Sequence, residues 1–253
     1  MLFIFYYFRK IYFAMKVGKS DTESITKVEG SAIDDISIDC VIFGFNNGIL
    51  EVLLVQHGEG DSKGEWGLPG GWIKKDESID NAANRLLEEL TGLDNVFLEQ
   101  LKVFGDPNRV SFRRVLTIGY YALIKREEDK LKASLVLTDA KWFKIKNIPN
   151  LIFDHNQIID YSLQHLRNRV RQAPIGFNLL PEKFTLLQLM KLYEEILDIE
   201  MDKSNFRRKI LHMKLLKPLD ERQKDVSHRA AKLYQFDQEI YDILTQKGFN
   251  FEF

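Results

Sequence analysis

The chain has 253 residues, 45% of them hydrophobic, which is enough for two globular domains. Its 36 lysines and arginines nearly balance its 37 aspartates and glutamates, so the net charge selects no class of partner. A single cysteine, Cys40, excludes an internal disulfide. Because Cys40 lies in an apolar run, we expect a buried thiol in a reducing compartment, the cytoplasm.

Residues 1–34 are expected to be a leader and a mobile arm. The leader, residues 1–15, is apolar, but Arg9 and Lys10 interrupt it. A secretory signal carries its charges first, and a transmembrane helix needs about 20 apolar residues. Neither pattern fits, so no membrane partner is expected. We interpret Met15 as the true start and residues 16–34, which are polar and lack periodicity, as the arm.

The first folded domain is predicted over residues 35–171 and begins with a β-hairpin. Apolar residues alternate with other residues over 36–42, and a second apolar run covers 49–55. The residues between the two runs include Asn46-Asn47-Gly48. Asn-Gly between two such runs is the strongest short signal for a hairpin turn, so a tight hairpin is predicted here.

An amphipathic helix is predicted after the glycines at 70 and 71. Ser78 is placed to cap this helix, and Asp80 suits its positive end. Gly92 occupies the position at which a left-handed C-terminal cap is usual. The apolar stripe between the caps follows helical spacing and comprises Ile79, Ala82, Ala83, Leu86, Leu87 and Leu90.

Further strands are predicted over 96–104, 114–124 and 140–143, with a charged turn at 126–132. A helix that Asp154 can cap then closes the domain. A hairpin, a helix, more strands and a closing helix together predict an α+β fold, in which helices pack on the faces of a mixed sheet.

A linker is predicted at 172–181, because its Pro and Gly residues break a helix. Its remaining residues are too apolar for a free tether, so we expect the domains to pack together. The second domain covers 182–253. Thr185 and Gln188 form a capping-box pattern at its first helix, and Asp202 can cap the second, which is helix-turn-helix spacing.

Two short strands around a basic loop at 217–229 are predicted to form a wing, followed by a final helix at 238–247. Between residues 203 and 232, ten cations and three anions leave a net charge of +7, which is typical of nucleic-acid binding. We expect base contacts from Ser204, Asn205 and Arg208, and phosphate contacts from Lys203, Arg207, Lys209, Arg222, Lys224 and Arg229. The alternative is a solvated charged helix in a protein-binding module.

The glycine-and-helix segment resembles the Nudix box, a loop-helix motif of magnesium-dependent pyrophosphohydrolases. The resemblance rests on Gly71, Glu77, Arg85, Leu87, Glu89, Gly92 and Leu93. Leu86 and Leu90, however, stand where that family has metal-binding glutamates. Mg²⁺ requires oxygen ligands, which leucine cannot supply. We therefore expect a scaffold without hydrolase activity, metal or cofactor, in which Arg85 pairs with Glu77 and Glu89.

The two halves together resemble the Nudix-related transcriptional regulators, through residues 177–186 and 205–209 as well as the degenerate box. The resemblance implies a homodimer that binds a palindromic double-stranded DNA operator and a small-molecule effector. One branch of that family senses ADP-ribose and controls NAD synthesis. The other branch, which this sequence resembles more, senses a pentose such as arabinose and controls sugar metabolism.

The resemblance also implies an effector cleft beside the box. Its candidate residues are Gly70, Gly71, Glu77, Arg85, Glu89, Arg109 and Arg114. An effector would shift the DNA-binding equilibrium through its differential affinity for two states, with the linker as transmitter. The rival interpretation is an active Nudix hydrolase of ADP-ribose or another nucleoside diphosphate derivative, with Mg²⁺ held by Glu88, Glu89 and a third carboxylate.

Overall fold

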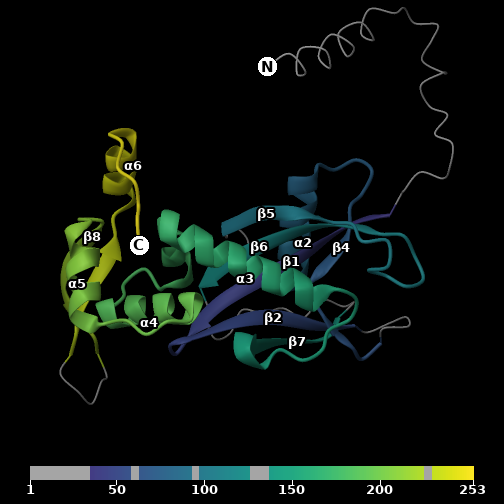
Figure 1. Ribbon diagram of the computed structural model, residues 1–253, viewed down its shortest axis with the longest axis horizontal. Helices are drawn as coiled ribbons and strands as arrows, with labels where there is room; N and C mark the ends of the chain where they lie inside the picture. The colour runs from purple at the N-terminus through teal and green to yellow at the C-terminus, as the bar shows by residue number, and fades with distance from the viewer. Residues whose placement is uncertain (1–34, 58–62, 93–96, 126–136, 225–229) are drawn as a thin grey trace, which may run out of the picture. The chain divides into compact units, whose positions relative to one another are not determined.

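Figure 1 shows the computed structural model, which describes residues 35–57, 63–92, 97–125, 137–224 and 230–253. The predicted leader and arm, the charged turn at 126–132, Leu93 and Arg229 lie outside these residues. In the described part of the chain, no helix is long and apolar enough to cross a membrane.

The fold begins with the predicted hairpin, formed by β1 (Ile36–Asn46) and β2 (Ile49–His57). Asn47 and Gly48 connect the strands, and both have positive φ angles, 49° and 81°. Two consecutive positive φ angles define the turn whose twist matches that of the flanking strands, and Asn-Gly adopts it at low cost. The hairpin prediction is confirmed.

The described strands of the first domain form one seven-stranded mixed sheet with the path β3-β2-β1-β6-β5. β1 pairs in parallel with β6, β4 pairs with β1, and β7 pairs with β2. The strands that follow the hairpin are β3 (Trp66–Gly67), β4 (Gly70–Trp72), β5 (Phe97–Phe104), β6 (Leu116–Lys125) and β7 (Leu137–Lys144). This confirms the predicted mixed sheet.

Helix α2 (Ile79–Thr91) covers one face of the sheet and α3 (His155–Gln172) covers the other (Figure 1). Side chains along β1 alternate between the two cores: Ile38 and Ile42 pack with α2, whereas Val41 and Phe43 join the core that contains α3. Cys40 is buried as predicted, and burial raises the pKa of its thiol. A short 3₁₀ helix, η1 (Ile145–Asn147), follows β7.

The predicted linker is buried and partly helical. It contains the 3₁₀ helix η2 (Pro174–Leu179), in which Phe177 and Leu179 are buried. These side chains join the core that contains α3. The expectation that the linker is no free tether is therefore confirmed.

The C-terminal domain contains α4 (Leu186–Leu197), α5 (Lys203–His212), β8 (Leu216–Arg222), β9 (Lys232–Phe236) and α6 (Gln238–Gln246). The capping box of Thr185 and Gln188 is present at α4. One prediction is wrong, because residues 217–222 form a strand rather than a loop. Few of their side chains are buried, so backbone pairing with β9 holds this strand, and an apolar pattern could not reveal it.

The two domains share a hydrophobic core and also make polar contacts. Leu50 of β2 lies in one cluster with Leu189 and Phe206 of the C-terminal domain. The Leu50 amide donates to Glu195 Oε2 at 3.2 Å, and Arg167 Nε donates to the Ile196 carbonyl at 2.8 Å. α4 is therefore docked against both β2 and α3.

Candidate functional site

The two glycines of the box let β4 and α2 approach closely. Gly70 and Gly71 lie in β4, which pairs with the start of β1. A Cβ added to Gly70 would lie 2.4 Å from the Ile38 carbonyl oxygen. One added to Gly71 would lie 2.7 Å from Leu86 Cδ2 of α2. A larger residue at position 70 would clash with the backbone of β1, whereas one at position 71 would displace the end of the Leu86 side chain.

Arg85 of α2 holds the loop that precedes the helix. Its Nε and Nη2 donate to Glu77 at 2.8 and 2.6 Å, its Nη1 donates to Glu89 at 3.0 Å, and Nη2 also reaches the Trp72 carbonyl at 3.1 Å. The hydrogen bonds from Arg85 and from the Lys74 amide lower the pKa of Glu77 to about 2. The predicted pairing of Arg85 is present, and it fastens the loop to the helix.

The helix face that binds metal in Nudix hydrolases is apolar here. Leu86 is 7% exposed, Leu90 is half-buried, and Glu88 and Glu89 are exposed. Within the described residues, no group of three or more His, Cys, Asp and Glu side chains is placed to hold a metal ion. A box-type Mg²⁺ site needs several oxygen donors on this face, and the residues present do not fit one.

Arg109, predicted to line the effector cleft, is buried and bonded to side chains of β1 and β6 and to Asp154 before α3. Its side chain is only 2% exposed, and it donates to Asp154 at 3.0 and 2.7 Å, to Thr117 at 2.7 Å and to Asp39 at 3.2 Å. Burial alone would raise the pKa of Asp39, but His155 and Arg109 beside it lower that pKa. With its donors used internally, Arg109 has no exposed surface for a ligand.

The same network corrects a second prediction. Asp154 precedes α3 as expected, but its side chain makes no capping hydrogen bond, because Arg109 takes both carboxylate oxygens. Arg114 lies before β6, which begins at Leu116, and its guanidinium donates to the Asp106 carbonyl at 3.0 Å. Of the candidate cleft residues, the structure brings together Gly70, Gly71, Glu77, Arg85 and Glu89, and it gives Arg109 and Arg114 roles in the neighbouring loop.

Aromatic residues near the box were missed in the sequence. Trp72 is 50% exposed, and the Arg113 guanidinium lies 5.1 Å above the centre of its ring. Phe112, next to Arg113, makes an edge contact with Phe153 at 6.3 Å, and both rings are exposed. Exposed aromatic faces can stack on a base. The position of Trp72 directly after the glycines was the signal that could have indicated it.

The basic face of α5 is exposed as the sequence predicted. Phe206 and Ile210 are buried and turn the helix so that its opposite face reaches solvent. Asp202 caps the helix by accepting from the Asn205 amide at 2.8 Å. Arg208 Nη2 in turn donates to Asn205 Oδ1 at 2.8 Å. The exposed residues are Lys203, Ser204, Asn205, Arg207, Arg208 and Lys209.

The described part of the wing consists of β8 and β9, which pair as antiparallel strands. Arg222 is exposed, but its Nη1 donates to the Ala230 carbonyl at 3.1 Å across the turn. Lys224 is exposed, and the predicted phosphate contact Arg229 lies outside the described residues. Arg222 therefore supports the shape of the wing through this contact.

Two side-chain contacts fasten the wing to the segment between the linker and α4. Lys183 Nζ lies 2.8 Å from Glu221 Oε1, and Gln235 Nε2 donates to Glu182 Oε1 at 2.8 Å. Glu182 and Lys183 lie in the chain shortly before α4. The wing and α4 therefore keep a defined relative orientation, which a helix and wing that contact the same DNA require.

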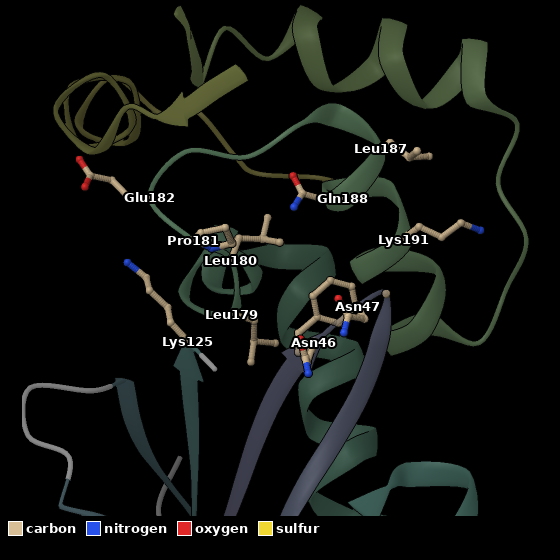
Figure 2. Close-up of a pocket in the computed structure, with 12 residues that line it drawn as sticks. Asn46, Asn47, Lys125, Leu179, Leu180, Pro181, Glu182, Leu187, Gln188 and Lys191 are labelled. Carbon is tan, nitrogen blue, oxygen red and sulfur yellow. The ribbon is translucent and has the colours of Figure 1, made fainter. Parts of the chain in front are cut away.

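A cavity of about 650 Å³ lies at the junction of the two domains (Figure 2). The turn of the β1–β2 hairpin forms one side and the start of α4 the other. Its polar lining residues are Asn46, Asn47, Lys125, Glu182, Gln188 and Lys191. Asn46 lies seven residues along β1 from Asp39, which pairs with Gly70, so the cavity and the box are roughly 23 Å apart.

This chain has a Nudix fold with an apolar face on the helix that binds metal in the hydrolases, and the fold is joined to a winged helix with an exposed basic face. This combination is typical of the ligand-responsive DNA-binding transcription regulators. Residues 34–166 match the family model of the NUDIX domain, and residues 176–236 match that of the NrtR DNA-binding winged helix domain. The chain therefore belongs to the NrtR family. This confirms the family and the fold that the sequence predicted.

Relatives agree with this assignment. The ADPR responsive transcriptional repressor NtrR of Acinetobacter baylyi is 31% identical over 213 residues, which cover 82% of this chain and 84% of that protein. The crystal structure of Shewanella oneidensis NrtR complexed with a 27mer DNA is similar, with 29% identity, a TM-score of 0.69 and coverage of 79% of this chain and 93% of the other.

A third similar structure is that of the NUDIX domain of Shewanella oneidensis NrtR complexed with ADP ribose. It has 29% identity and a TM-score of 0.52, and covers 58% of this chain and 99% of that domain. Of the two branches that the sequence left open, these relatives belong to the one named for ADP-ribose. ADP-ribose is thus the effector named for these relatives.

Proposed function

We propose that this chain is an ADP-ribose-responsive repressor that acts in the cytoplasm as a homodimer on a palindromic DNA operator. Residues 35–171 form its effector domain and residues 182–253 its DNA-binding domain. The relatives that respond to or bind ADP-ribose, and the relative complexed with DNA, support both halves of this proposal.

One observation carries the proposal. Arg85 still ties Glu77 and Glu89 together, so the loop of the box keeps its shape, while Leu86 and Leu90 remove the oxygen ligands from the helix face. A loop that keeps its shape beside a helix without metal ligands is suited to holding a ligand without hydrolysing it. The exposed ring of Trp72 beside the loop offers a stacking surface for the adenine base.

The DNA-binding part of the proposal places the N-terminal half of α5 in the major groove. Asn205 and Arg208 form a hydrogen-bonded pair on the exposed face, so Arg208 is already oriented for a bidentate contact to guanine. Lys203, Arg207 and Lys209 flank that face, and Lys224 extends it along the wing. These side chains can contact the phosphates on both sides of the groove.

The first experiment is selection of genomic DNA fragments by the purified full-length protein, beginning with the region upstream of its own gene. Each selected fragment is then titrated with ADP-ribose and, as the control ligand, arabinose. Release by ADP-ribose alone would establish the effector. Release by arabinose alone would restore the pentose branch, and no binding at low salt would remove the repressor function.

The rival function is hydrolysis, and it is tested separately. We expect no Mg²⁺-dependent release of AMP from ADP-ribose, and the same lack of turnover with other nucleoside diphosphate derivatives. Turnover that disappears in the Glu89→Gln variant would instead establish a hydrolase with a metal site unlike the usual one.

Two substitutions separate base reading from phosphate contact. Arg208→Ala should lower affinity for the operator by about 1–3 kcal/mol and relax the sequence preference, because a bidentate base contact is lost. Lys224→Ala should weaken binding to operator and random DNA alike and reduce the slope of log K against log salt by about one. If both variants lose affinity equally on all sequences, α5 does not read bases.

A further inference from the structure

The last five residues form a tail, residues 249–253, that follows α6 and lies outside both ranges matched by the family models. Gly248 has a φ of 87°, and the Phe249 amide donates to the Leu244 carbonyl at 2.9 Å. This is the usual left-handed helix stop, which turns the chain back at a defined angle. The direction of the tail is thus set by the end of α6.

The tail inserts aromatic side chains against the recognition helix. Phe251 is 4% exposed. The ring of Phe253 lies 3.9 Å from the ring centre of Tyr193 on α4 and 5.6 Å from that of Phe206 on α5. Lys209 Nζ, on the DNA-facing side of α5, lies 5.3 Å from the centre of the same ring. Phe253 therefore contacts α5 through both its buried and its basic face.

The tail also contacts the effector domain. The Phe253 amide donates to the Arg171 carbonyl at 3.0 Å, in the last turn of α3. Figure 1 shows the chain descending from α6 to this end of α3. At the opposite end of α3, Asp154 binds Arg109, which also binds Asp39 of β1, the residue that pairs with Gly70 of the box. The 18 residues of α3 span about 27 Å, so one rigid helix joins the two places.

The aromatic stack around Phe253 contains an unsatisfied polar group. The hydroxyl of Tyr193 is buried and has no hydrogen-bond partner among the described residues. A buried hydroxyl without a partner loses its hydration and regains nothing, so this packing is less favourable than an apolar one.

We propose that Phe253 is a positioning residue that couples α3 to the recognition helix α5 and so transmits effector occupancy to DNA binding. A shift of α3 moves the Arg171 carbonyl, to which the Phe253 amide is hydrogen-bonded. The ring of Phe253, which contacts Phe206 and Lys209 of α5, then moves with it. This inference rests on the proposed function, because it assumes an effector near the box and DNA at α5. It adds a second connection to the predicted route through the linker.

The test uses the full chain with Phe253→Ala, and Glu252→Ala as the matched exposed control. Three quantities are measured: ADP-ribose affinity without DNA, operator affinity without ADP-ribose, and the factor by which saturating ADP-ribose weakens operator binding. We expect Phe253→Ala to keep its ADP-ribose affinity but to lose about fivefold or more of that factor. Glu252→Ala should keep the wild-type factor, and Phe253→Tyr, which retains the ring, should restore it.

An unchanged factor in Phe253→Ala would overturn the proposal, as would a loss of operator affinity with the factor intact, because that result indicates a purely structural role. If Phe253→Ala does not fold, Phe253→Leu takes its place and must show the same loss. A wild-type protein that does not bind DNA, or that ADP-ribose does not release, would refute the proposed function before any variant is compared.

Discussion

At the scale of single residues, Arg85 and Arg109 show how one residue type takes different roles near one loop. Arg85 fixes the loop through Glu77, a contact that the Nudix resemblance implied, and its pairing with Glu89 was predicted from their spacing on the helix. Arg109 is buried between Asp39 and Asp154, which are 70 and 45 residues away in the chain. No local pattern could indicate that burial.

Glu77→Gln should make the fold less sensitive to acid. The pKa of Glu77 is about 2 in the folded protein and lies below its ordinary value of 4.5. Its contribution to stability is therefore present above pH 4.5 and is lost as the pH falls toward 2. Melting temperatures from pH 5 to pH 3 should fall less steeply in Glu77→Gln than in wild type. Glu88→Gln, on the exposed side of α2, should behave as wild type, and equal slopes for all three proteins would contradict the prediction.

His57 should make folding stability depend on pH near neutrality. Burial and the neighbouring His155 lower its pKa below the ordinary value of 6.5. The unfolded state therefore binds a proton at His57 at a higher pH than the folded state does. The contribution of neutral His57 to stability is complete above pH 6.5 and is lost as the pH falls through the lowered pKa. In urea titrations at pH 7 and pH 5, His57→Gln should reduce the difference in unfolding free energy. The exposed His212→Gln serves as control, and a wild-type-sized difference in His57→Gln would rule out this role.

At the scale of elements, the residues at the ends of helices and strands determine where most of these elements begin and end. Ser78, Thr185 and Asp202 each cap the helix that the sequence assigned to them. Asn47-Gly48 makes the hairpin turn. The extent of strand β8 over residues 217–222 escaped prediction, because a polar edge ribbon is held by its backbone ladder and by Lys183 pairing with Glu221, and neither leaves an apolar pattern.

Asp202 should show that the cap of α5 matters for DNA binding. Asp202→Ala removes the acceptor of the Asn205 amide and should destabilise the helix start by about 1 kcal/mol. Operator affinity, measured by fluorescence anisotropy, should fall with it. Asp202→Asn keeps a capping oxygen but removes a negative charge near the phosphates, so its affinity should equal or exceed that of wild type at low salt. Equal losses in both variants would show that the charge, rather than the cap, is what matters.

At the scale of the whole molecule, the shared core makes the two domains one mechanical unit. Leu50 from the effector domain lies in the same core cluster as Leu189 and Phe206 from the winged helix, and Glu195 accepts a hydrogen bond from the Leu50 amide. Each domain covers part of the apolar surface of the other. If one domain unfolded, the apolar surface that it covers on the other domain would be exposed to water. We therefore expect residues 35–253 to unfold in a single cooperative transition.

Tryptophan fluorescence can test this cooperativity, because Trp66, Trp72 and Trp142 all lie in the effector domain. Leu189→Ala, at a fully buried position of α4, should cost about 2–5 kcal/mol and shift the tryptophan transition although it alters the other domain. Leu187→Ala, at a position 48% exposed on the same helix, should leave that transition in place. A tryptophan transition unmoved by Leu189→Ala would mean that the domains unfold independently.

The sequence by itself determined the hairpin, the capped helices, the degenerate box and the basic outward face of α5. Each of these depends on residues within one or two turns of one another, where propensity, capping and periodicity act. The burial of Arg109, the shared core and the contact of Phe253 with Arg171 were decided only by the tertiary structure. They join residues 45 to 145 positions apart in the chain, or strand to helix across a packed layer, and no local pattern encodes which distant partner completes them.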